Sequence, residues 1–413
     1  MKTRLQFLIT MLFVSAIISA QEITVNTSMG ALYSNQVYYK LSTQTETTFA
    51  TNSWDIAFLR TSNFAQAIRV NGGKGIEVFE ASNDINDWNT IDVANEASWT
   101  KLYNSDKVWN DGAFSNGSAT YGWGEYNIVT HTVVGTVIFV LKYADGSYKK
   151  FINETYLGAY NFKYSSWDGS SWSADTTATV ANTSNPNNKY NYYSLQDNAE
   201  VVAEPAITDW DLKFTRYFTE VAPNTQYLVT GVLHNDSVEI AENDEPGGAA
   251  VNPTLTYSTD INTIGYDWKS FTGMGFSVDS DKAFYVKYAD DTIYRLYFTV
   301  FSGSSSGDLT FKFENVTNSL SVEEVTEGIS FGVYPNPSTD KKINLIYDVN
   351  KLINNKNEVA IYSTTGQKVF QEILKNRSGF YNKTLDLSSL SSGVYILQFN
   401  SGEYTTTKKI ILK

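Results

Sequence analysis

The sequence predicts an all-β protein made of two related antiparallel β units in tandem plus a small C-terminal β-sandwich. Three observations support this. The 413 residues include 9 Trp, 28 Tyr and 23 Phe, and no long stretch has the apolar period of a helix. The string KYAD occurs twice, at 142–145 and 287–290. Beyond residue 331, short apolar runs alternate with turn residues, a pattern typical of a sandwich.

Residues 1–20 have the pattern of a secretory signal peptide. A basic start is followed by an apolar run and a small residue, Ala20, before Gln21. The apolar run is too short for a membrane-spanning helix. We therefore expect an exported chain with no transmembrane segment after processing.

Each KYAD copy belongs to a longer series of strand signals. A Trp-Asp strand precedes each copy, at 54–60 and 209–217, and an FK-aromatic strand follows, at 162–164 and 311–313. Self-similarity of this kind indicates duplicated structural units.

We place the first unit at 21–180 and the second at 190–318, joined by a linker rich in Asn, Ser and Pro. In the first unit, alternation puts Trp54, Ile56 and Phe58 on one face of a strand, and Asp145-Gly146 forms a hairpin turn. An acidic connector over 319–330 leads to the last domain, at 331–413.

Composition excludes several classes of function. The formal charge is −13 without a basic stripe, which argues against nucleic acid and anionic membranes as partners. The absence of cysteine removes disulfides, thiolate chemistry and an N-terminal lipid anchor on Cys.

No enzyme motif is complete. The string at 303–307 fits G-x-S-x-G, but it joins two β segments and no His follows it. The glycine loop at 71–75 lacks the ending of a P-loop, and 83–87 lacks the Gly and Glu of a calcium loop. We expect a protein that is not an enzyme, although carboxylate pairs for glycoside hydrolysis stay open.

The C-terminal segment resembles the type A sorting domain of the type IX secretion system. The resemblance rests on YPNPS (334–338), IYSTTGQKV (361–369), DLSSLSSGVYIL (386–397) and the terminal KKIILK. It implies passage through the outer membrane by the type IX machinery and a secreted or cell-surface location.

The two N-terminal units resemble the HmuY family of secreted haem-binding proteins. The resemblance is carried by YYKL with WDIAF and EYNIVTHTVVG in the first unit, and by YYSL, WDLKF and IGYDWKS in the second. It implies an all-β fold that takes haem from host haemoproteins through axial His or Met side chains. The sequence departs from the family in having no lipoprotein Cys and no His or Met near 162–164.

Two residues occupy the same place in the two copies. His131 precedes Lys142 by about as many residues as Met274 precedes Lys287. Imidazole and thioether both bind haem iron, so these two are the candidate metal ligands. Six aromatic residues are expected to cover porphyrin faces, Trp123, Tyr126 and Phe139 near His131 and Trp268, Phe271 and Phe276 near Met274.

The sequence therefore favours a secreted or surface haem- or porphyrin-binding protein of HmuY-like type. The alternative is a surface adhesion or carbohydrate-binding module that keeps the fold without haem. In that case His131 is a loop residue and Met274 fills a gap in a core. A third residue, His234, lies at the end of a strand and is a weaker candidate ligand.

Overall fold

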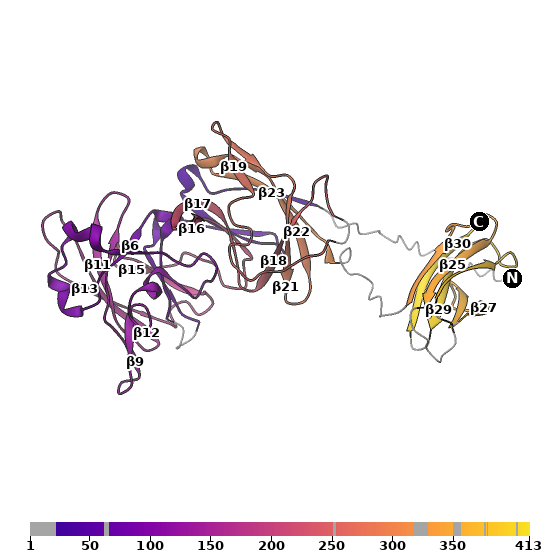
Figure 1. Ribbon diagram of the computed structural model, residues 1–413, viewed down its shortest axis with the longest axis horizontal. Helices are drawn as coiled ribbons and strands as arrows, with labels where there is room; N and C mark the ends of the chain where they lie inside the picture. Colours follow the sequence, from indigo (N-terminus) through magenta and orange to yellow (C-terminus); the bar gives the residue numbers. More distant parts are fainter. Residues whose placement is uncertain are drawn as a thin grey trace, which may run out of the picture. The chain divides into compact units, whose positions relative to one another are not determined.

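The computed structural model describes residues 22–61, 66–250, 253–317, 329–349, 357–375, 377, 379–401 and 404–413. The chain divides into two compact units, Met1–Leu320 and Ser321–Lys413. Strands dominate both units (Figure 1), which confirms the all-β fold class. The predicted signal peptide and most of the acidic connector lie outside the described residues.

The first unit contains two pairs of sheets, here called sandwich A and sandwich B. The larger sheet of sandwich A contains β6 (Glu77–Ser82), β7 (Thr100–Leu102), β8 (Gly124–Asn127), β9 (Thr132–Gly135), β10 (Ile138–Lys142), β11 (Tyr148–Tyr156), β12 (Ala159–Ser166) and β13 (Thr176–Ala181). The smaller sheet contains β4 (Ile56–Leu59), β5 (Ile68–Val70), β14 (Tyr190–Ser194) and β15 (Ala199–Val201). Their orders are β13-β12-β11-β10-β6-β7, extended by the β8–β9 hairpin, and β15-β14-β4-β5.

Sandwich B repeats this plan. The larger sheet contains β1 (Ile23–Ser28), β18 (Val238–Asp244), β21 (Lys282–Tyr288), β22 (Ile293–Phe301) and β23 (Asp308–Asn315). The smaller sheet contains β2 (Asn35–Lys40), β3 (Thr45–Ala50), β16 (Leu212–Ala222) and β17 (Thr225–His234), and a separate hairpin is formed by β19 (Lys269–Phe271) and β20 (Phe276–Val278). The orders are β1-β23-β22-β21-β18 and β17-β16-β2-β3.

Short 3-10 helices connect several strands. They are Ala31–Tyr33, Thr51–Ser53, Gly72–Lys74, Ile85–Asn89, Val93–Ser98, Ala113–Asn116 and Gly303–Ser305. The last of these carries the G-x-S-x-G string and joins β22 to β23, as the sequence predicted. The predicted turn at Asp145-Gly146 joins β10 to β11, with Gly146 at a φ of 83°.

Strand alternation gives the smaller sheet of A an apolar layer on each of its two faces. In the smaller sheet of A, Ile56 and Phe58 point into the core of that sandwich, whereas Ala57 and Leu59 point the other way. This second face belongs to one buried layer with side chains of sandwich B, among them Tyr38 and Leu233 of its smaller sheet. The two sandwiches are therefore joined through their smaller sheets, and β4 is buried on both faces.

One predicted strand face is wrong. Trp54 does not share the face of Ile56 and Phe58, because it belongs to the layer between the sandwiches. The strand begins only at Ile56, so the period of two does not extend back to Trp54.

The two sandwiches exchange strands. In chain order, β1, β2 and β3 are followed by a Trp-Asp strand (β4), a KYAD strand (β10) and an FK strand (β12). The strands β13, β14 and β15 are then followed by the second set, β16, β21 and β23. The first strands of each copy, however, pair within the other sandwich: β1 pairs with β23 and β2 with β16, while β13 pairs with β12 and β14 with β4.

The two copies are thus interlocked. The ranges 21–180 and 190–318 approximate the two copies in strand order, but neither range completes a sandwich from its own strands. The strand correspondence also puts the start of the second copy at β13, before residue 180.

The second compact unit is a smaller two-sheet domain. One sheet contains β24 (Ile329–Tyr334), β25 (Lys342–Val349) and β28 (Gly379–Asp386). The other contains β26 (Asn357–Ser363), β27 (Lys368–Leu374), β29 (Gly393–Ser401) and β30 (Tyr404–Leu412). Side chains from both sheets, including Leu345, Ile361 and Leu397, form one buried core. This is the β-sandwich expected at the C-terminus.

Candidate functional site

The predicted ligand residues lie on two hairpins that hold matching places in the two copies. His131 is in the turn of the β8–β9 hairpin, just before the KYAD strand β10. Met274 is in the turn of the β19–β20 hairpin, just before the KYAD strand β21. The first hairpin belongs to sandwich A and the second lies beside sandwich B.

The β8–β9 turn presents its side chains to solvent. Ile128 and Val129 are 77% and 84% exposed. His131 has a positive φ of 54°, and its Nδ1 lies 2.8 Å from the hydroxyl of the exposed Tyr126. Because Tyr126 occupies Nδ1, Nε2 is the imidazole nitrogen left for a ligand.

The β19–β20 turn carries Met274 at its tip. The turn closes through the N–H of Thr272, which donates to the carbonyl of Gly275 at 2.8 Å, and Met274 is 100% exposed. Met274 therefore does not fill a gap in a core.

The hairpins that carry His131 and Met274 lie apart. Figure 1 shows β9 and β19 projecting from opposite sides of the first unit. Two axial ligands must face one another across one iron atom, so this pair does not fit a six-coordinate haem within one chain.

The two predicted indoles lie in the cores. Trp123 is fully buried and its Nε1 donates to the carbonyl of Gln66 at 3.0 Å. Trp268 is stacked on Phe298 with 3.8 Å between ring centroids. Because protein atoms cover both rings, neither offers a face to a ligand at the surface.

His234 is buried and both of its ring nitrogens have contacts. Nδ1 lies 2.8 Å from the carbonyl oxygen of Asn235, and Nε2 lies 2.8 Å from that of Asp260. Burial lowers the pKa of His234, although the contacts with two carbonyl oxygens act in the opposite direction by favouring the protonated ring. With both nitrogens taken, His234 is not available as an iron ligand.

An aromatic groove opens beside the β19–β20 hairpin. It has a volume of about 720 Å³, within the usual range for ligand sites. Its lining comes from the far end of the β16–β17 hairpin, both strands of the β19–β20 hairpin and the two 3-10 turns at 31–33 and 303–305. The aromatic residues that line it are Tyr33, Tyr227, Tyr266, Phe271, Phe276 and Phe301.

Packed aromatic rings form the floor of this aromatic groove, and solvent-exposed rings form its rim. Phe301 is buried, and Phe276 meets it edge-on at 4.9 Å between ring centroids. Gly303 permits this contact, because it has a φ of +69° and an added Cβ would lie 2.9 Å from the Phe276 ring. By contrast, Tyr227 and Phe271 are 63% and 66% exposed.

Two cations line the groove. Arg216 lies over the Tyr33 ring at 5.8 Å, and desolvation lowers its pKa. Lys269 donates from Nζ to the carbonyls of Thr230, at 2.6 Å, and Tyr266, at 3.2 Å. Burial lowers the pKa of Lys269 to about 7.

The aromatic residues predicted near Met274 include Phe271 and Phe276 of this groove, but the sequence did not predict most of its lining. Arg216 and Tyr227 lie on adjacent strands and Tyr33 on a distant 3-10 turn, so no local motif links them. The one available signal was the run QYLVT at 226–230, which places apolar side chains on both faces of a hairpin end.

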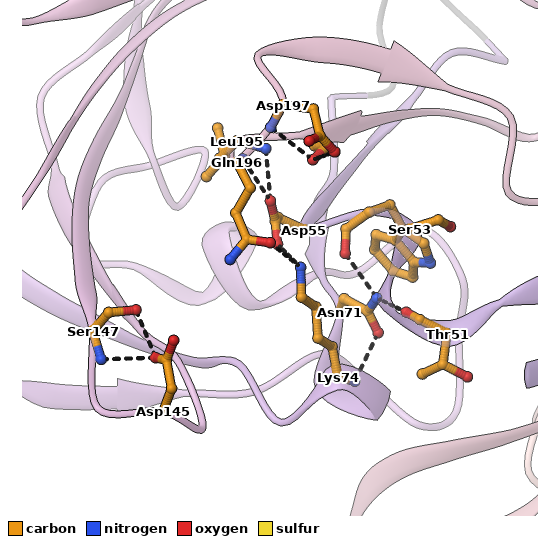
Figure 2. A network of polar contacts seen from close by, with 12 residues as sticks. Thr51, Ser53, Asp55, Asn71, Lys74, Asp145, Ser147, Leu195, Gln196 and Asp197 are labelled. Carbon is orange, nitrogen blue, oxygen red and sulfur yellow. Dashed lines mark hydrogen bonds and ion pairs between the residues drawn. The ribbon is translucent and has the colours of Figure 1, made fainter. Parts of the chain in front are cut away.

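The two Trp-Asp motifs lie where strands are exchanged between the two sandwiches. Asp55 accepts the N–H of Leu195 at 2.6 Å and pairs with Lys74 at 2.7 Å, as Figure 2 shows. The adjacent Asn71 donates to the carbonyl of Thr51 and accepts the N–H of Lys74 (Figure 2).

Asp211 makes the matching contacts in sandwich B. It accepts the N–H of Leu41 at 2.8 Å, pairs with Lys40 at 2.7 Å, and accepts the hydroxyl of Tyr288 from the second KYAD. Asp55 and Asp211 are both 0% exposed. Each carboxylate joins a Trp-Asp strand of one copy to a Tyr-Tyr strand of the other, so these groups stabilise the exchange rather than bind a ligand.

Comparison with known families identifies the C-terminal domain. Residues 332–413 match the family model described as the secretion system C-terminal sorting domain. The chain is exported. This type IX sorting domain indicates a secreted or cell-surface protein that engages the type IX secretion machinery. No curated protein matches the chain.

Among the described residues, no helix is long and apolar enough to cross a membrane. Nor do three or more His, Asp or Glu side chains gather there in a way that could hold a metal ion.

Proposed function

We propose that the exported protein is a non-enzymatic surface module that binds a carbohydrate in the aromatic groove of sandwich B. The observation that carries this proposal is the set of exposed aromatic rings on the groove, Tyr227 and Phe271 above all. Sugar rings present C–H faces that pack against aromatic faces, while their hydroxyls need hydrogen-bonding partners. The groove supplies such partners in Ser270 and Ser304, both exposed.

A glycan array probed with the exported protein tests this proposal. We expect binding that falls about tenfold, a loss of about 1.4 kcal/mol, in Tyr227→Ala and Phe271→Ala. The matched control is Tyr126→Ala, which removes an exposed aromatic ring from sandwich A and is expected to leave glycan binding unchanged. The proposal fails if no glycan binds, or if the groove variants and the control bind alike.

A second candidate function is haem binding on the β8–β9 hairpin, as the HmuY resemblance implies. The Tyr126–His131 contact supports it, because tyrosine and histidine are both iron ligands and the two are adjacent and exposed. When bound, haem would supply iron that either side chain could hold. This proposal uses one hairpin and leaves Met274 out.

Titration with hemin separates the two functions. Haem binding at this hairpin predicts a Soret shift that the double variant Tyr126→Phe/His131→Ala abolishes and Met274→Ala leaves intact. A protein that gives no shift, or the same shift in the double variant, has no haem site at the β8–β9 hairpin.

A further inference from the structure

Arg216 has fewer hydrogen-bond and ion-pair partners than the other arginines described in this unit. Arg60 donates to the carbonyls of Asn182 and Asn188, each at 2.7 Å. Arg69 donates to four carbonyls, and Arg295 pairs with two carboxylates. Arg216 makes one long hydrogen bond, 3.4 Å to the carbonyl of Gly73, and no ion pair with any described residue.

A half-buried guanidinium without a carboxylate partner is unfavourable by itself. Removing part of the hydration shell costs free energy that a paired charge recovers and an unpaired one does not. Arg216 lies on β16 at the wall of the groove, so a ligand in the groove can reach it.

The lining of the groove has a charge opposite to that of the chain. The whole protein carries −13, with 44 acidic and 31 basic residues. The residues that line the groove include Arg216 and Lys269 but neither Asp nor Glu. Lys269 has a pKa of about 7, so above that pH the positive charge of the lining comes from Arg216. This charge suits an anionic ligand, whereas a neutral sugar would need none.

We propose that the groove binds an acidic polysaccharide, in which a uronate carboxylate pairs with Arg216 while neighbouring sugar rings pack on Tyr227 and Phe271. This inference rests on the proposed carbohydrate function and names the class of glycan. A guanidinium offers two parallel N–H donors that match the two oxygens of a carboxylate, which explains an arginine at this place. Lys269 lies over the Phe301 ring at 4.6 Å and adds positive charge to the groove only below about pH 7.

Titration calorimetry with two matched ligands tests the assignment. One ligand is an oligosaccharide of galacturonic acid, and the other is the same chain with its carboxyls reduced to primary alcohols. We expect the acidic ligand to bind at least about tenfold more tightly, because a charged hydrogen-bonded pair is added. Its affinity is also expected to fall with added salt, while that of the neutral ligand stays constant.

Three variants test which residues cause the tighter binding of the acidic ligand. Arg216→Met keeps much of the aliphatic packing and is expected to reduce binding of the acidic ligand to the level of the neutral one. Arg216→Lys, which keeps the charge but not the planar pair of donors, is expected to bind the acidic ligand with intermediate affinity. Tyr227→Ala is expected to weaken both ligands. An unchanged melting temperature in each variant shows that the fold is intact.

The outcomes separate the two proposals. If the neutral ligand binds as tightly as the acidic one, or if Arg216→Met leaves the acidic ligand unaffected, the assignment of an acidic glycan is overturned and carbohydrate binding stands. If the exported protein binds neither ligand and no glycan on the array, both proposals fail.

Discussion

At the scale of single residues, the two Trp-Asp motifs owe their repetition to a structural task. Asp55 and Asp211 are buried carboxylates, each held by a backbone N–H and a lysine. A buried ion pair adds little net stability, but removing one partner leaves the other charge uncompensated. The repeated motif therefore marks where the exchanged strands are joined and does not mark a catalytic site.

Replacing one of these carboxylates tests that role. We expect Asp211→Ala to destabilise the native state by about 3 kcal/mol, because Lys40 and the N–H of Leu41 lose their acceptor. Urea unfolding measures the loss. The control is Asp244→Ala on β18, an exposed aspartate, for which a change within about 0.5 kcal/mol is expected. Equal effects of the two substitutions would contradict the structural role of Asp211.

The pKa of Lys269 makes the stability depend on pH. Burial lowers this pKa from 10.5 to about 7 in the folded state, so the unfolded chain binds more protons between these two values. Stability is therefore expected to rise with pH across this window, by up to about 1.4 kcal/mol per pH unit from this group. Below about pH 7, the folded state bears the full cost of the buried charge.

Thermal unfolding between pH 7 and 9, with Lys269→Met as the comparison, checks this expectation. The variant removes the titrating group but keeps an apolar stem, so its stability should rise less steeply with pH. Lys213 contributes a similar rise, since burial lowers its pKa to about 8, and that part remains in the variant. Identical pH profiles would show that Lys269 titrates normally in the folded protein.

At the scale of elements, the two hairpins before the KYAD strands hold the same place in the chain order of the two copies but pack differently. The β8–β9 hairpin continues the larger sheet of A through pairing of β9 with β11. The β19–β20 hairpin forms its own two-stranded sheet, and it contacts the body through Phe276 and Phe301. Only the second hairpin borders the aromatic groove, so the two copies have diverged in the element where a ligand was expected.

Two substitutions on the β19–β20 hairpin should have unequal effects. Phe276→Ser is expected to destabilise the protein by about 1–2 kcal/mol and to weaken ligand binding, because its ring packs on Phe301. Met274→Ser should change stability by less than about 0.5 kcal/mol, since the side chain is fully exposed. Melting curves and glycan binding, measured on both variants, test these expected effects on stability and binding. A large loss of stability in Met274→Ser would show that the tip is packed.

At the scale of the whole molecule, the strand exchange makes each sandwich depend on both copies. The turn between β12 and β13 lies at the point where the first copy ends, and Gly169 is exposed there. Cutting the chain at this turn leaves β1, β2 and β3 in sandwich B, although they are covalently attached to the first copy. The two fragments should therefore stay together without a peptide bond.

A site-specific protease sequence inserted after Gly169 tests the interlocking. After cleavage, the fragments are expected to elute as one species in native buffer and to separate in denaturant. Independent expression of 22–169 is expected to give no folded protein, because sandwich A would lack β13, β14 and β15. Elution of two separate folded fragments would contradict the exchange.

The sequence by itself determined the fold class and the export domain, and its repeated motifs predicted two related units. Alternating apolar residues, turn pairs such as Asp145-Gly146 and the repeated KYAD are local signals, and the structure keeps them in the predicted order. The sorting domain was predicted because a run of short motifs appears in order within one contiguous segment.

Only the tertiary structure decided which copy each strand joins and where a ligand can bind. The Tyr-Tyr strands β2 and β14 have similar patterns, so alternation gives their faces but not their partners. The groove draws Tyr33, Arg216, Tyr227 and Phe271 from distant segments. The charge of the groove depends on long-range packing, because Arg216 can be recognised as a cation without a carboxylate partner only when all of its neighbours are known.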